Sequence, residues 1–154
     1  MSSETILLLV ILCGFVSVLY GAISSKQILS ANAGNDKMQE IALAIQIGAK
    51  AYLNRQYTTI AIVGFVVLIL IRFLFSIWVG LGYILGALLS GVAGYVGMLI
   101  SVQANVRTAE ASRTSLDSGL RIAFKSGAIT GMLVAGLALL AIAVYYYLLL
   151  KFNV

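Results

Sequence analysis

Apolar residues form long uninterrupted stretches in this 154-residue chain instead of alternating with polar ones. The four main apolar runs extend over Thr5–Ala22, Thr58–Trp78, Leu81–Val102 and Ala123–Leu150. Each is long enough for an α-helix to cross the hydrocarbon core, which takes at least about 17 residues. Because only a few residues separate the second and third runs, Trp78–Gly82 is expected to form the turn of a tight helical hairpin. The pattern predicts an all-α integral membrane protein with about four transmembrane helices, all within one membrane domain covering residues 1–154.

Composition supports lipid as the solvent for this chain. Hydrophobic residues make up 62% of the sequence and charged residues only 10%, whereas charged residues supply about a quarter of a typical soluble domain. The net charge of +5 would suggest nucleic acid in a soluble protein, but here topology explains it better, and no nucleic-acid partner is expected. The first run lacks the basic segment of a signal peptide, because Glu4 is the only charge before it. We therefore expect a retained helix.

Basic residues gather around two of the three connections, at residues 25–57 and 103–122. They are Lys26, Lys37, Lys50 and Arg55 in the first group, and Arg107, Arg113, Arg121 and Lys125 in the second. By the positive-inside rule, both long loops are expected to be cytoplasmic and both termini outside, in a multi-pass protein of the inner or plasma membrane. Tyrosine and tryptophan near the opposite ends of the runs are typical interfacial anchors. They are Trp78, Tyr83 and Tyr145–Tyr147.

Helical extensions are predicted within both basic loops. Asp36 is expected to cap a helix, with Gln39 as its capping-box partner. Apolar residues then recur at helical spacing as far as Leu53, which predicts an amphipathic helix that runs into the second membrane helix. A separate helix on the membrane surface is the alternative. The second loop is read as extensions of the third and fourth helices, joined near Thr114–Gly119.

Small residues recur four positions apart in the last two runs, a spacing that lets membrane helices approach closely. The candidate packing residues are Gly86, Ser90, Gly94, Gly127 and Gly131. Arg72 is the unusual residue of the second run, because an arginine at mid-bilayer costs at least a few kcal/mol. One interpretation places it near the end of the span, where its side chain reaches the interface. The other is an intramembrane cation on an ion path.

The acidic residues limit the chemistry that this sequence offers. The five carboxylates are Glu4, Asp36, Glu40, Glu110 and Asp117, and histidine is absent. None lies in the middle of a predicted span, where an ion carrier normally places a carboxylate, which disfavours a small transporter. Hydrolysis of a phosphate compound with Mg²⁺ requires several converging carboxylates. No catalytic, metal-binding or substrate-binding residue is therefore assigned.

Three stretches go beyond generic membrane helix. They are Met38–Tyr57, Ser90–Met98 continued by Ser101–Ala109, and Gly119–Gly131. In order and spacing they resemble the N-terminal part of the membrane-bound, ion-translocating pyrophosphatases, with the resemblance covering about Met38–Met132. Ile47 departs from the pattern, since the family often has glutamate there.

The resemblance implies an outer-ring portion of a homodimeric pump that hydrolyses pyrophosphate with Mg²⁺ and drives H⁺ or Na⁺ outward. The family's catalytic residues lie beyond the region covered, so the chain is expected to be truncated after its fourth helix and inactive alone. Asn105, Arg107 and Thr108 match a family pattern, which implies a structural or coupling role for Arg107, paired with Glu110 or Asp117. An ordinary arginine at a helix end is an equally good account. A non-enzymatic four-helix scaffold or accessory subunit is the alternative function.

Overall fold

The computed structural model describes residues 3–152, in which all the regular structure is α-helical. The helices are α1 (Ser3–Leu29), α2 (Asp36–Leu74), α3 (Ile77–Thr114) and α4 (Leu116–Lys151). All four are long and apolar enough to cross a membrane. The predicted all-α membrane fold with four spanning helices and helical extensions is confirmed.

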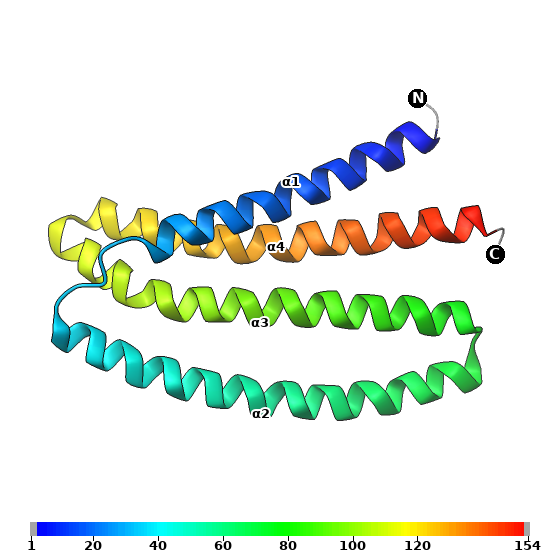
Figure 1. Ribbon diagram of the computed structural model, residues 1–154, viewed down its shortest axis with the longest axis horizontal. Coiled ribbons are helices and arrows are strands. Elements are labelled where there is room, and N and C mark those ends of the chain that lie inside the picture. Colours follow the sequence, from blue (N-terminus) through cyan, green and yellow to red (C-terminus); the bar gives the residue numbers. More distant parts are fainter. Residues whose placement is uncertain (1–2, 153–154) are drawn as a thin grey trace.

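The four helices lie side by side in the order α1, α4, α3, α2, as in a single layer (Figure 1). Within residues 3–152, α2 contacts only α3, while α4 lies between α1 and α3. The α1–α2 and α3–α4 connections both fall at the same end of the layer, which we call the loop end (Figure 1). The α2–α3 connection falls at the opposite end, which we call the hairpin end.

The amphipathic segment and the second membrane span form one continuous helix of 39 residues. This outcome confirms the predicted helical extension. The cap, however, is one residue earlier than expected: the Asn35 side chain accepts a hydrogen bond from the Met38 amide at 3.0 Å. Gln39 donates to the Gly34 carbonyl instead of completing a box with Asp36. Asn35 adopts an extended backbone, which is the conformation of an N-cap, whereas Asp36 is already helical.

The hairpin turn was expected at Trp78–Gly82, and the structure corrects this position. α2 ends at Leu74 and α3 begins at Ile77, so only Phe75 and Ser76 lie between them, both in extended conformation. The glycines after Trp78 are helical because a membrane helix keeps its backbone hydrogen bonds internally and tolerates glycine. The other close connection lies where it was predicted, at Ser115, whose hydroxyl accepts from the Ser118 amide at 3.1 Å.

The buried core is small and lies between α1, α3 and α4. Its members are Ile28, Ile100, Ala104, Ile129 and Leu133. A second close contact joins α1 to α4 along glycines: a Cβ on Gly136 would lie 2.7 Å from the Ser17 Cβ and 2.9 Å from the Gly14 carbonyl oxygen. Glycine is therefore required at this crossing. Sequence reasoning missed it, because the first run appeared too uniform to reveal a packing face.

A single layer leaves most of its apolar surface uncovered. In the most apolar window of each helix, no more than 17% of the residues are buried. Phe73 and Phe124, for example, are 83% and 82% exposed. Such a surface is stable only in contact with lipid or with further apolar protein.

Candidate functional site at the loop end

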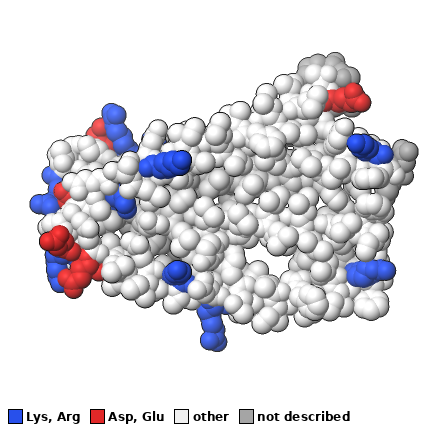
Figure 2. Space-filling model, in the orientation of Figure 1, with Lys and Arg blue, Asp and Glu red and all other residues white. Residues whose placement is uncertain are grey.

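Charged side chains gather at the loop end, while the central band of the layer is almost free of them (Figure 2). The loop end also holds Asn105, Arg107 and Thr108, the candidate coupling residues, and Arg107 of α3 connects two helices there.

Arg107 joins the end of α1 to α3. One terminal nitrogen, Nη2, donates to the Leu29 carbonyl at 2.8 Å, and the other, Nη1, donates to the Gln103 carbonyl at 2.7 Å. Leu29 is the last residue of α1, so its carbonyl has no partner within that helix. A cation at a helix C-terminus is also favoured by the helix dipole. Arg107 Nε is buried and has no hydrogen-bond partner in the described structure.

The expected ion pair between Arg107 and Glu110 or Asp117 is not formed. Glu110 instead pairs with Arg113 at 3.0 Å, and Asp117 pairs with Arg121 at 2.8 Å. Each of these two pairs joins residues about one turn apart on the same helix. Arg107 points away from them toward α1, where backbone carbonyls take the place of a carboxylate.

A polar groove of about 610 Å³ runs beside Arg107, between the first turns of α2 and the last turns of α3. Its lining residues are Ala33, Asp36, Gln39, Glu40, Ala42, Leu43, Gln46, Gln103, Val106 and Arg107. The groove thus mixes two carboxylates with one guanidinium and three amides. Within residues 3–152, no three His, Cys, Asp or Glu side chains come together in a way that could hold a metal ion. The groove therefore offers a polar contact surface, without the donor set of a magnesium centre.

Asn105 and Thr108 do not converge on Arg107. Asn105 is exposed and lines a separate groove of about 220 Å³ that faces α2, together with Met38 and Ile41. Thr108 contributes its backbone carbonyl to the Ser112 hydroxyl at 2.8 Å. Successive helical residues point in different directions, so the three positions form no common site.

The predicted packing glycines fall into two groups. A Cβ on Gly94 would lie 2.6 Å from the Tyr57 hydroxyl of α2, so Gly94 does sit at a helix contact. Gly86, Gly127 and Gly131 have open space where a Cβ would be. Ser90 is exposed as well. Gly86, Gly127 and Gly131 therefore make no close contact with another described helix, and the packing role of these three glycines and of Ser90 stays a prediction.

Arg72 lies in the last turn of α2 and its side chain is exposed. The position is close to the hairpin end, three residues before Phe75. A cation in the last turn interacts favourably with the helix dipole.

Tyrosines organise the α2–α3 contact, which sequence reasoning did not identify. Tyr57 and Tyr95 meet edge to face with their ring centroids 5.3 Å apart, and the Tyr95 hydroxyl donates to Asn54 Oδ1 at 3.2 Å. Further toward the hairpin end, the Tyr83 hydroxyl donates to the Gly64 carbonyl at 3.2 Å. Between these contacts lies an apolar groove of about 580 Å³. The signal available in the sequence was the pairing of tyrosine with glycine on neighbouring helices.

The fold and its uncovered apolar faces define a multi-pass, all-helical membrane protein. Comparison with known proteins then gives its family: residues 15–153 match the model described as inorganic H⁺ pyrophosphatase. The chain belongs to this family. The predicted resemblance is thereby confirmed.

Curated relatives support the same assignment. The chain is 47% identical over 139 residues to a K(+)-insensitive pyrophosphate-energized proton pump of Methanosarcina mazei, covering 89% of this chain and 21% of the relative. It is 38% identical over 135 residues to a second pump of that name from Moorella thermoacetica, covering 87% and 20%. It is 42% identical over 130 residues to a protein of Bacteroides thetaiotaomicron assigned as a K(+)-stimulated pyrophosphate-energized sodium pump, covering 80% and 18%. The chain spans about a fifth of the length of these relatives.

Proposed function

We propose that this chain forms the N-terminal outer wall of a pyrophosphate-energised ion pump. The observation that carries the proposal is the match to the pump family over residues 15–153, combined with coverage of about a fifth of each relative. The uncovered apolar layer supports it, because such a layer requires further helices or lipid on both faces. The open glycine positions of α3 and α4 supply surfaces on which other helices could pack closely.

The proposed pump couples Mg²⁺-dependent pyrophosphate hydrolysis to outward transport of H⁺ or Na⁺. The magnesium and pyrophosphate sites are assigned to parts of the pump other than residues 3–152, whose side chains contain no metal-binding cluster. Within this assembly, Arg107 acts as a positioning residue that holds the end of α1 against α3. The remainder of the pump and a second copy of it, as a homodimer, are the proposed partners.

We also propose that the loop end faces the cytoplasm in an inner or plasma membrane. The proposal is supported by the clustering of lysine and arginine there, since basic loops are retained on the cytoplasmic side. In this orientation, the first residues of α1, the last residues of α4 and the hairpin end all lie near the outer face.

Complementation tests the proposed function directly. Membranes containing only this chain are expected to show no Mg²⁺-dependent pyrophosphate hydrolysis above membranes without it. The Methanosarcina mazei pump lacking its matching segment is likewise expected to be inactive, and co-expression of this chain should restore hydrolysis and ion uptake into vesicles. The matched control is co-expression of this chain with Gly136→Leu, which disrupts the α1–α4 crossing. Hydrolysis by the chain alone would refute the assignment of catalysis to other parts of the pump.

A further inference from the structure

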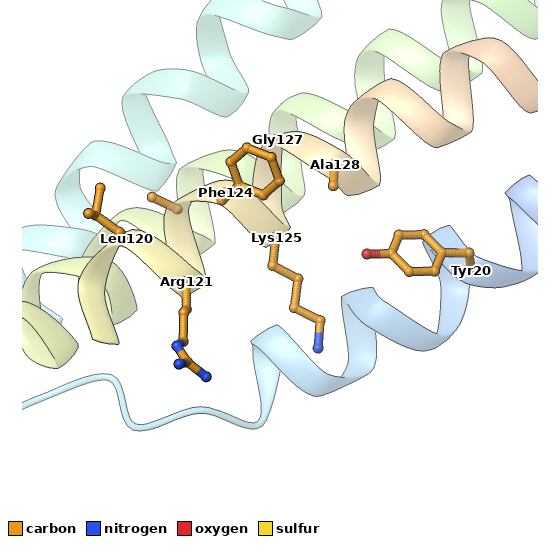
Figure 3. Close-up of a pocket in the computed structure, with 8 residues that line it drawn as sticks. Tyr20, Leu120, Arg121, Phe124, Lys125, Gly127 and Ala128 are labelled. Atoms are coloured by element: carbon orange, nitrogen blue, oxygen red, sulfur yellow. The ribbon is translucent and has the colours of Figure 1, made fainter. Parts of the chain in front are cut away.

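A groove of about 960 Å³ lies along α4 beside α1, separate from the polar groove at Arg107. Its lining residues are Tyr20 of α1 and Leu120, Arg121, Ala123, Phe124, Lys125, Gly127 and Ala128 of α4. Figure 3 shows Arg121 and Lys125 extending from α4 on the side of α1, with the Tyr20 hydroxyl pointing toward Lys125. Phe124 and Gly127 lie on the opposite side of α4 in this view, so the part of the groove that faces α1 is formed by the two cations, Tyr20 and Ala128.

The cations lie closer to the loop end than Tyr20 and Ala128 do. Arg121 and Lys125 are within the first three turns of α4, which begins at Leu116, whereas Ala128 lies further along α4 and Tyr20 lies nine residues before the end of α1. Ala128 lies seven positions after Arg121, which corresponds to about 10 Å along a helix axis. This length matches the passage from a polar headgroup to the first part of an acyl chain.

The cations in this groove are only partly neutralised. Lys125 Nζ donates to the neutral Gln27 Oε1, and no carboxylate of the described chain lies within ion-pair distance of it. Arg121 pairs with Asp117 through Nε alone, and its side chain is 79% exposed. Nitrogen donors of both residues remain available for an anion.

The apolar part of the groove suits a hydrocarbon chain. Ala128 gives it a shallow floor beside the ring of Tyr20. Phe124, which is 82% exposed, stands at its edge. Basic pockets between membrane helices, placed at the level of the headgroups, are the usual recognition sites for anionic lipids.

We propose that the Tyr20–Arg121–Lys125 groove binds one anionic phospholipid, with its phosphate on Lys125 and Arg121 and an acyl chain along Ala128 and Tyr20. The occupant is a lipid rather than a free phosphate because the groove continues from the cations into the apolar span. The inference does not depend on the proposed pump function, since it needs only a membrane-embedded chain.

Native mass spectrometry of the full chain, incubated with equal amounts of phosphatidylglycerol and phosphatidylcholine of matched acyl chains, tests the proposal. The wild-type chain should retain phosphatidylglycerol preferentially. Each of Lys125→Gln and Arg121→Gln should weaken that preference by about fivefold, the contribution of one basic residue near an anionic headgroup. Lys125→Arg, which keeps the positive charge, should keep the wild-type preference for phosphatidylglycerol. The matched controls Lys37→Gln and Arg113→Gln remove exposed basic residues at the same end but outside the groove, and should leave the preference unchanged.

Three further results would overturn the proposal. Equal retention of the two lipids by the wild-type chain shows that the groove does not select an anion, whatever the variants do. Displacement of phosphatidylglycerol by inorganic phosphate, beyond that caused by sodium chloride of the same ionic strength, assigns the cations to a free anion. A loss of preference in Arg113→Gln equal to that in Lys125→Gln shows general surface attraction instead of a defined site.

Discussion

At the scale of single residues, the most informative side chain is Arg107, which bonds to backbone carbonyls rather than to a carboxylate. Hydrogen bonds to a charged group contribute about 1.5–3 kcal/mol each, and here one of them satisfies the free C-terminal carbonyl of α1. The positive-inside rule accounts for an arginine near this position. It does not account for the direction of the side chain, which the approach of α1 to α3 determines.

Replacing Arg107 by glutamine is expected to loosen the end of α1. The variant loses both carbonyl contacts, so amide hydrogen exchange in residues 26–31 should accelerate by at least about tenfold, the equivalent of about 1.4 kcal/mol. Exchange measured by mass spectrometry provides the test. Arg113→Gln serves as the control, because Arg113 donates to Glu110 within its own helix. Equal acceleration in both variants would show that Arg107 is an ordinary arginine at a helix end.

At the scale of elements, helix contacts in this chain depend on where glycine meets a neighbouring backbone. Gly136 and Gly14 meet at the α1–α4 crossing, and Gly97 faces Thr130 at the α3–α4 contact. Gly127 and Gly131 lie on the same helix as Gly136 but face open space. Spacing alone cannot separate these cases, because the face that a glycine presents to a partner depends on the crossing of the two helices.

Gly136→Ala should therefore destabilise the chain, while Gly127→Ala should not. The new Cβ at position 136 would meet backbone at 2.9 Å, and overpacking of this kind costs about 1–3 kcal/mol. The measurement is the temperature at which half of the purified protein leaves its monodisperse gel-filtration peak.

In the assembled pump, Gly127→Ala should instead lower activity if other helices pack on this face. Unchanged activity there would contradict the packing role predicted for Gly127.

The sequence predicted the elements better than their ends or their partners. Long apolar runs predict four spanning helices because, in hydrocarbon, an α-helix satisfies all backbone hydrogen bonds within the segment itself. The cap at Asn35 instead of Asp36 and the turn at Phe75–Ser76 depend on local backbone conformation, which neighbouring residue types do not determine uniquely. The partner of Arg107 and the α1–α4 crossing depend on contacts between residues far apart in the chain.

At the scale of the whole molecule, the loop end and the hairpin end lie on opposite sides of the helices, so the orientation of the chain in the membrane can be tested by labelling each end. Cys13 is the only cysteine, so a Cys13→Ser background allows single-cysteine labelling. With the loop end in the cytoplasm, a membrane-impermeant maleimide should label Phe75→Cys in intact cells and should label Lys37→Cys only after permeabilisation. Both positions are exposed in the structure. The reverse pattern would overturn the proposed topology.

The spatial order of the helices also determines the sequence of events during synthesis. α1 has its main partner in α4, the last helix of the chain, rather than in α2, which follows it. At about 5–20 residues per second, Gly14 leaves the ribosome many seconds before Gly136, the residue against which it packs. During that interval the glycine-bearing side of α1 is covered only by lipid or by the insertion machinery. The α1–α4 contact can therefore form only after α4 has been synthesised. Until then, α1 stays in the membrane without its main partner helix.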